Sequence, residues 1–173
     1  ENEKKIIKIC QSVDHRHIGI KSGILDQSAS QLSKEGYVIA IDFQKESYRH
    51  IKTDFSNCSW VLVDSRIRRE LATSKYHDRV EECRRGLSIL SRILNREISF
   101  RDISNKELSL LTKSYPTIGS RIKHLLEENI RVNEMEEAIA KNNPKQIGKL
   151  LIASHCSLRD LYEVSCEEID YLI

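Results

Sequence analysis

The sequence of 173 residues contains little glycine, and its six glycines are isolated, with no two adjacent in the chain. Glycine-rich loops are the segments whose backbone N–H groups usually surround the phosphates of a nucleotide. No stretch of this chain resembles such a loop. The 173 residues therefore show no recognisable site for a triphosphate.

The cysteines are spaced unlike those of a metal site or a disulfide framework. There are five, an odd number, and none forms a C-x-x-C pair. Free thiols in a reducing cytosol are the simplest interpretation, so we expect a cytoplasmic protein. The residues contain no signal-peptide pattern and no apolar run with a length of about 18 residues, so they indicate neither secretion nor a membrane span.

The charges are numerous but nearly cancel. Charged residues make up 31% of the chain and leave a formal net charge of +2. Nucleic-acid-binding domains usually concentrate basic residues on one face. Two arginine clusters, at 66–69 and 84–85, are the local exceptions, and Glu81 and Glu82 lie beside the second. We expect no nucleic acid and no membrane as a partner.

Hydrophobic spacing predicts a few short strands followed by longer helices. Runs of β-branched or alternating residues predict strands near 37–43, 47–53 and 60–64. Helical periodicity predicts helices near 3–14, 23–33, 75–94, 105–113, 118–141, 145–160 and 166–172. The polar, turn-prone segment 54–59 is the candidate boundary between two parts of the chain.

Three helix starts carry capping signals. Ser104 with Glu107, and Ser165 with Glu168, fit the capping box, in which a hydroxyl and a carboxylate satisfy the free donors of the first turn. Asn143 before Pro144 offers a capping side chain followed by proline at the first helical position. These signals predict helices that begin at or just after each of these positions.

The most informative stretch runs from Gly19 to Ser30 and places Asp26 just inside an apparent helix start. We expect Ser22 to cap this helix, because its hydroxyl can accept hydrogen bonds from the first turn. The helix dipole favours an ionised acid at the position of Asp26. Gly23 has no side chain, so a small ligand can approach its backbone closely. An ordinary helix-start acid after a glycine turn is the alternative interpretation.

The segment Gly23–Gln27 resembles the Gly-Ile-(Leu/Met)-Asp-Gln signature of the galactokinases, in the GHMP family of small-molecule kinases. Further runs resemble other parts of these kinases, in the same order along the chain: 60–76 (WVLVDSRIRRELATSKY), 79–83 (RVEEC), 121–132 (RIKHLLEENIRV), 154–160 (SHCSLRD) and 162–166 (YEVSC). A match that covers nearly the whole chain is far more specific than one pentapeptide.

This resemblance implies an α/β (α+β) fold. Residues 1–55 are expected to end the N-terminal α/β domain of a GHMP kinase, which carries the substrate and catalytic site. Residues 56–173 are expected to form an incomplete, mostly helical portion of its ferredoxin-like C-terminal domain. The chain begins without methionine and ends inside an amphipathic pattern, so we expect a central-to-C-terminal fragment of a longer enzyme.

The resemblance also implies an activity, that of an ATP-dependent sugar 1-kinase acting on the anomeric hydroxyl of galactose, with Mg²⁺. Asp26 is the expected catalytic base, and Gly23, Asp26 and Tyr76 are expected to contact the sugar. The family's phosphate loop is absent from these residues, so we assign no ATP-binding residue and no metal ligand, and we expect no activity from the chain alone. A small-molecule sugar is the expected partner, with possible self-association through unpaired strand edges.

Two other functions remain open. Ser28-Ala29 after Gln27 is similar to the kinases of galacturonate or arabinose in the same family, whereas the runs 154–160 and 162–166 favour a galactokinase. A non-catalytic, galactokinase-like protein that binds sugar or regulates is the other possibility. The intact Asp26 argues against it.

Overall fold

The computed structural model of the chain describes residues 2–19, 22–56, 58–59, 61–67 and 75–173. They form two compact units, the first made mostly of residues up to 60 and the second mostly of residues from 61 onward. The expected division at residues 55 and 56 refers to the two domains of a complete GHMP kinase. It is a different question from these compact units and stays a prediction.

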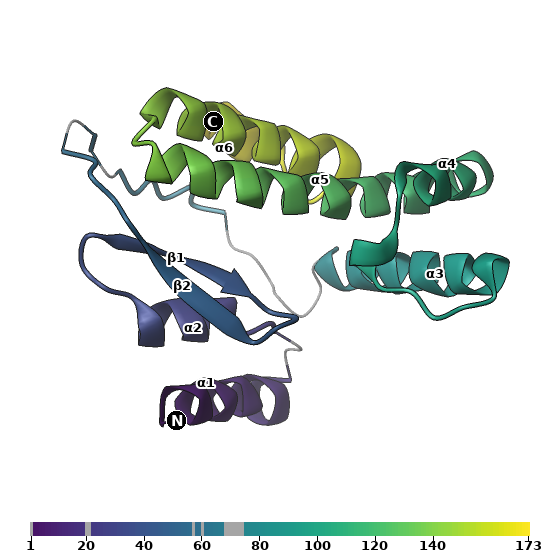
Figure 1. The fold of residues 1–173 in the computed structure, drawn as a ribbon, viewed down its shortest axis with the longest axis horizontal. Coiled ribbons are helices and arrows are strands. Elements are labelled where there is room, and N and C mark those ends of the chain that lie inside the picture. Colours follow the sequence, from purple (N-terminus) through teal and green to yellow (C-terminus); the bar gives the residue numbers. More distant parts are fainter. Residues whose placement is uncertain (1, 20–21, 57, 60, 68–74) are drawn as a thin grey trace. The chain divides into compact units, whose positions relative to one another are not determined.

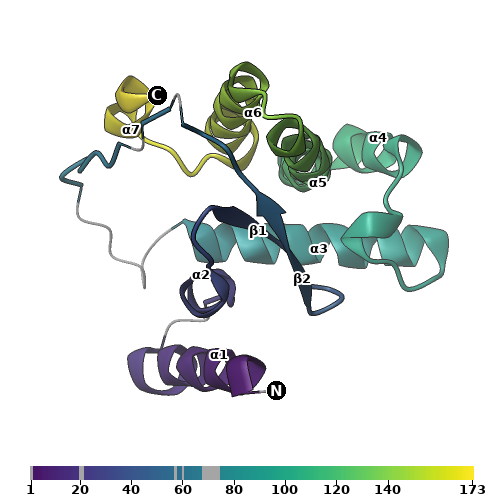
Figure 2. The same cartoon turned by 60° about the vertical axis from the view of Figure 1, so that its left-hand side comes forward.

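The first unit consists of two helices and a β-hairpin, and α2 lies between α1 and the hairpin (Figures 1 and 2). Its elements are α1 (Asn2–Val13), the π-helical turn η1 (Asp14–Ile18), α2 (Leu25–Leu32), β1 (Tyr37–Asp42) and β2 (Ser47–Lys52). Gly19 ends η1 with a φ of 77°, a left-handed conformation that glycine adopts without strain. Ile7 and Leu32 are buried and form the small core of this unit.

The hairpin follows from its turn chemistry. The strands β1 and β2 pair antiparallel, with Tyr37 opposite Lys52 and Asp42 opposite Ser47. The side chain of Asp42 accepts hydrogen bonds from the backbone N–H groups of Gln44 and Lys45, each at 3.0 Å. Such a carboxylate replaces the backbone acceptors that a tight turn lacks. The predicted strands 37–43 and 47–53 are confirmed.

The second unit is helical and has one main hydrophobic core. Its elements are α3 (Tyr76–Leu94), the 3₁₀ turn η3 (Phe100–Asp102), α4 (Asn105–Ser114), α5 (Pro116–Ala140), α6 (Pro144–Ser157), the π-helical turn η4 (Leu158–Tyr162) and α7 (Glu167–Leu172). The helices α5 and α6 lie side by side (Figures 1 and 2). The core contains Cys83, Leu90, Ile98, Ile103, Leu111, Ile118, Ile122 and Tyr162. In the part of the chain described here, no helix has both the length and the apolar character needed to cross a bilayer.

A glycine brings α3 close to α5. A Cβ atom at Gly86 would lie 2.8 Å from Ile118 Cγ2 and 3.1 Å from the side chain of Ile122. Real side chains do not approach so closely, so a larger residue would force the two helices apart. The absence of a side chain at Gly86 therefore permits the contact between α3 and α5.

The predicted helices are confirmed, and most of their ends lie within three residues of the expected positions. The capping box at Ser104 and Glu107 is present. The capping box at Ser165 is wrong, because Cys166 occupies the cap position and Ser165 Oγ donates to Asp170 Oδ1 at 2.6 Å instead. A capping box that we did not predict joins Ser99 and Asp102 at the start of η3.

The predicted strand at 60–64 is wrong for the residues that are described. Trp60 lies outside the described residues, and residues 61–64 have no regular structure. Val61, Leu62 and Val63 are 78%, 100% and 58% exposed. An extended segment becomes a strand only when a neighbouring strand satisfies its backbone groups, and no described segment pairs with this one. The exposed apolar run is compatible with the expected self-association, which stays a prediction.

Candidate functional site

Asp26 and Gly23 lie together at the start of α2. Asp26 occupies the first turn of the helix, and both residues are exposed to solvent. A Cβ atom placed on Gly23 would meet nothing within 4 Å. The start of α2 thus presents an accessible carboxylate three residues after an open stretch of backbone.

The predicted cap of this helix is wrong. The cap position is taken by Ile24, which makes no side-chain cap hydrogen bond. Ser22 lies two residues earlier, and its Oγ donates to Asp14 Oδ2 at 2.8 Å. The local sequence predicts Ser22 as a capping residue, but in the folded chain the carboxylate of Asp14 is a stronger, charged acceptor for its hydroxyl.

Asp14, the first residue of η1, links that turn to the start of α2. Its Oδ2 accepts a second hydrogen bond from Gln27 Nε2, at 2.6 Å. The backbone oxygen of Ser22 is contacted by Gln11 Nε2 at 3.2 Å and by His15 Nε2 at 2.9 Å. Sequence reasoning missed Asp14, because its two partners lie 8 and 13 residues further along the chain and no periodic pattern connects them. These contacts hold the backbone on both sides of Gly23 and Asp26.

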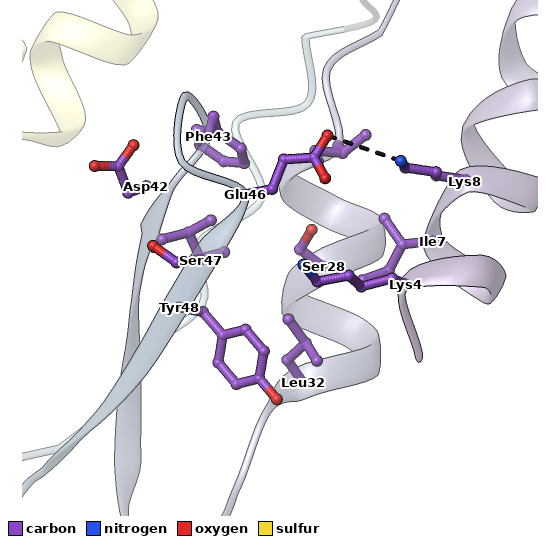
Figure 3. Close-up of a pocket in the computed structure, with 12 residues that line it drawn as sticks. Lys4, Ile7, Lys8, Ser28, Leu32, Asp42, Phe43, Glu46, Ser47 and Tyr48 are labelled. Carbon is purple, nitrogen blue, oxygen red and sulfur yellow. Dashed lines mark ion pairs between the residues drawn. The ribbon is translucent and has the colours of Figure 1, made fainter. Parts of the chain in front are cut away.

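A small pocket lies on the other side of α2, between α1 and the hairpin (Figure 3). Ile7, Ser28, Leu32 and Tyr48 are among its lining residues, and Asp26 is not. Its volume is about 60 Å³, whereas pockets for small molecules usually measure about 300–1,000 Å³. We therefore interpret it as a packing gap of the first unit and not as a sugar site.

Ser28 faces this gap and not the surface that carries Asp26. It is only 3% exposed. Two residues along a helix correspond to a rotation of about 200°, which places Ser28 on nearly the opposite side of α2 from Asp26. Its small size therefore has a packing reason, apart from any role in choosing the sugar.

Tyr76 is the first residue of α3, in the second unit, and its side chain is outside what the structure describes. Residues 68–74 of the same run also lie outside the described residues. The sugar-contacting role of Tyr76 stays a prediction. Among the described residues, no three His, Cys, Asp or Glu side chains are grouped so that they could hold a metal ion, and Mg²⁺ remains implied by the resemblance alone.

No family model matches the chain, but individual proteins match nearly all of it. It is 35% identical over 168 residues to the galactokinase of Thermosipho africanus, and 34% identical over 169 residues to that of Thermotoga maritima. These alignments cover 97% and 98% of the chain. The crystal structure of Lactococcus lactis galactokinase complexed with galactose matches 98% of the chain, with a TM-score of 0.81 and 29% identity.

The chain is homologous to the galactokinases. It spans 46% of the length of these two curated galactokinases and 44% of the Lactococcus lactis galactokinase chain. The galactokinase resemblance predicted from Gly23–Gln27 and the later runs is confirmed, and Asp26 and Tyr76 lie within a match of this extent. A mostly helical α+β fold agrees with the galactokinase match, whereas the assignment to a ferredoxin-like domain stays a prediction.

Proposed function

We propose that the full-length protein containing this chain is a galactokinase, which transfers a phosphoryl group from ATP to the anomeric hydroxyl of galactose. The observation that carries the proposal is the homology to galactokinases over 97% or more of the chain, and the exposed Asp26 in the first turn of α2 supports it. The likeness to a galactokinase whose structure was determined with galactose supports a galactose-like sugar as substrate.

In this proposal Asp26 is the general base. The described residues provide no hydrogen-bond partner for its carboxylate, which leaves its oxygens available to a substrate. Asp26 accepts the proton of the anomeric hydroxyl as that oxygen bonds to phosphorus and the bond from phosphorus to the leaving diphosphate oxygen breaks. ATP, when bound, would supply the phosphoryl group, and Mg²⁺ would neutralise the negative charge of the ATP phosphates.

The other residues of the proposed site bind and orient the sugar. Gly23 leaves room for the sugar beside the backbone of the first unit, and Tyr76 of the second unit is the aromatic contact to the sugar that the galactokinase resemblance implies. Asp14 holds Gly23 and Asp26 indirectly, because its hydrogen bonds to Ser22 and Gln27 fix the segment between them. Holding the substrate and the catalytic group in a fixed orientation contributes strongly to the rate of phosphoryl transfer.

The test is substitution of Asp26 in the full-length protein. Asp26→Ala should lower kcat by at least about 100-fold, the usual contribution of a general base, while the affinity for galactose changes less. Asp26→Asn should lose similar activity although it keeps the shape of the side chain. Glu3→Ala is the control, since Glu3 is an exposed acid in the first turn of α1. Near-normal turnover by Asp26→Ala would show that Asp26 is only a helix-start acid.

A kinase of galacturonate or arabinose is the second candidate, and the residues Ser28-Ala29 favour it. The burial of Ser28 against α1 and the hairpin weakens this argument, because packing already accounts for a small residue there. Phosphorylation assays of the full-length protein with galactose, galacturonate and arabinose separate the two candidates. Sugar binding without turnover of any of the three would indicate a non-catalytic relative.

We also infer a reducing compartment, as in the cytoplasm. All five cysteines are described, and none is in a disulfide. Cys10 and Cys58 are exposed thiols. Exposed thiols persist unpaired where the surroundings are reducing.

A further inference from the structure

A group of two arginines and two glutamates joins three segments of the second unit. Arg79 and Glu82 belong to the first turns of α3, Arg121 belongs to α5, and Glu163 follows η4. We call these four residues the ion network. Arg121 is 1% exposed and Arg79 is 7% exposed. Guanidinium groups buried to this extent require charged or polar partners.

The ion network supplies those partners through directional hydrogen bonds. Arg79 Nη1 donates to both carboxylate oxygens of Glu82 at 2.8 Å, and Arg121 Nε donates to Glu82 Oε2 at 2.9 Å. Arg121 Nη2 donates to Glu163 Oε2 at 2.8 Å, and its Nη1 donates to the backbone oxygen of Leu161. Burial alone would raise the pKa of Glu82, but the hydrogen bonds from Arg121 and Arg79 outweigh it and lower the pKa.

Glu163 is the residue that ends η4. Its φ is 55°, in the left-handed region that residues other than glycine seldom adopt. Its N–H donates to the oxygen of Leu158, which closes the turn after η4. An uncommon backbone conformation persists where surrounding contacts determine it, and here the Glu163 carboxylate lies on Arg121.

The ion network acts on the turn of α3 that begins with Tyr76. Positions 76 and 79 are three residues apart, so they are neighbours along one side of the helix. The close contact at Gly86 sets how near the middle of α3 lies to α5 and turns that face of α3 toward α5. The planar forks of Arg79 and Arg121 orient the first turns of α3, because guanidinium hydrogen bonds have fixed directions.

We propose that the ion network positions Tyr76, the expected sugar contact of the second unit. It holds the first turn of α3, and with it Tyr76, against α5 and the turn after η4. Glu163 and Arg121 are therefore positioning residues that act through Tyr76. This inference rests on the proposed function, in which Tyr76 contacts the sugar.

The test begins with Glu163→Gln in the full-length protein. The side chain of Glu163 is 55% exposed, and glutamine keeps an oxygen that can accept from Arg121. The substitution therefore removes one negative charge, while the buried Arg121 keeps its hydrogen bonds to Glu82 and to the backbone oxygen of Leu161. We expect the KM for galactose to rise roughly tenfold through misplacement of the sugar contact, with the KM for ATP unchanged. The control is Asp160→Asn, which breaks the exposed pair with Arg159 in the same turn and does not reach α3. An unchanged KM for galactose in Glu163→Gln would overturn the proposal.

A double-mutant cycle distinguishes positioning from a general loss of stability. If the ion network acts through Tyr76, Glu163→Gln should add little to the galactose KM of a Tyr76→Ala protein. Additive effects of the two substitutions would show that Glu163 acts by another route, and would overturn the proposal.

Hydrogen exchange tests the same coupling without any assay of activity. In Glu163→Gln, the amides of residues 80–83 in α3 should exchange faster than in the unaltered protein, while those of α4 keep their rate. Unchanged exchange in α3 would overturn the proposal. If the unaltered full-length protein does not phosphorylate galactose, the proposed function fails, and hydrogen exchange still decides whether the ion network holds the first turns of α3.

Discussion

His124 is a titratable residue in the interior of the second unit. It is 4% exposed, its Nδ1 lies 2.8 Å from Ser157 Oγ, and its ring stacks on Tyr162 with 4.5 Å between the ring centres. Burial lowers the pKa of His124, because a charged imidazolium loses its hydration there, while the nearby Glu128 opposes this effect. The folded chain therefore favours the neutral ring.

This residue should make the stability of the protein depend on pH. Below about pH 6.5 an unfolded histidine gains a proton that the buried ring resists, so the free energy of unfolding should fall as the pH is lowered from 7 to 5. Urea unfolding at several pH values measures this decrease. His124→Gln should reduce the pH dependence, and His17→Gln, at an exposed position, is the control substitution. An identical pH dependence in His124→Gln and the unaltered protein would contradict the assignment.

At the scale of the elements, a second close contact joins α4 and α5. A Cβ atom at Gly119 would lie 2.5 Å from Thr112 Oγ1 and 2.7 Å from Thr112 Cα. The nearer atoms include backbone, which cannot move aside as a flexible side chain can. The start of α5 can therefore approach the end of α4 only because residue 119 is glycine.

Gly119→Ala should destabilise the second unit by about 1–3 kcal/mol, the usual cost of overpacking. The matched control is Gly148→Ala in α6, where a Cβ atom would meet nothing within 4 Å. Alanine is the better helix former by about 0.5–1 kcal/mol, so the control should be neutral or stabilising. Urea unfolding of both variants measures the difference. Equal stability of the two would show that α4 and α5 adjust to the extra methyl group.

At the scale of the whole molecule, the 173-residue chain by itself should not phosphorylate a sugar. Phosphoryl transfer is catalysed mainly by positioning and by stabilisation of charge, and the six scattered glycines of the chain form no loop that could surround a triphosphate. At the proposed site, Asp26 by itself would only add a further negative charge near the reacting group. Calorimetric titration with ATP–Mg²⁺ and a coupled assay with galactose test this directly. Tight nucleotide binding or measurable turnover would mean that the phosphate site lies within these residues.

The amino-acid sequence by itself determined where most helices and the hairpin lie, and which proteins the chain resembles. Helical periodicity, the capping box at Ser104 and the turn between β1 and β2 depend on residues close together in the chain, so their signals can be read locally. The motif Gly23–Gln27 and the later runs indicated the galactokinases for the same reason: they are short and contiguous.

Only the tertiary structure decided which partner each polar or apolar group finds. Ser22, predicted as a helix cap, donates to Asp14 instead, and Ser28 is a buried packing residue. The β-prone run at 61–63 stayed irregular because no described strand pairs with it. The hydrogen bonds of Arg121 reach partners 39 to 42 residues away. Such contacts depend on the path of the chain through space, and no spacing of neighbouring residues specifies them.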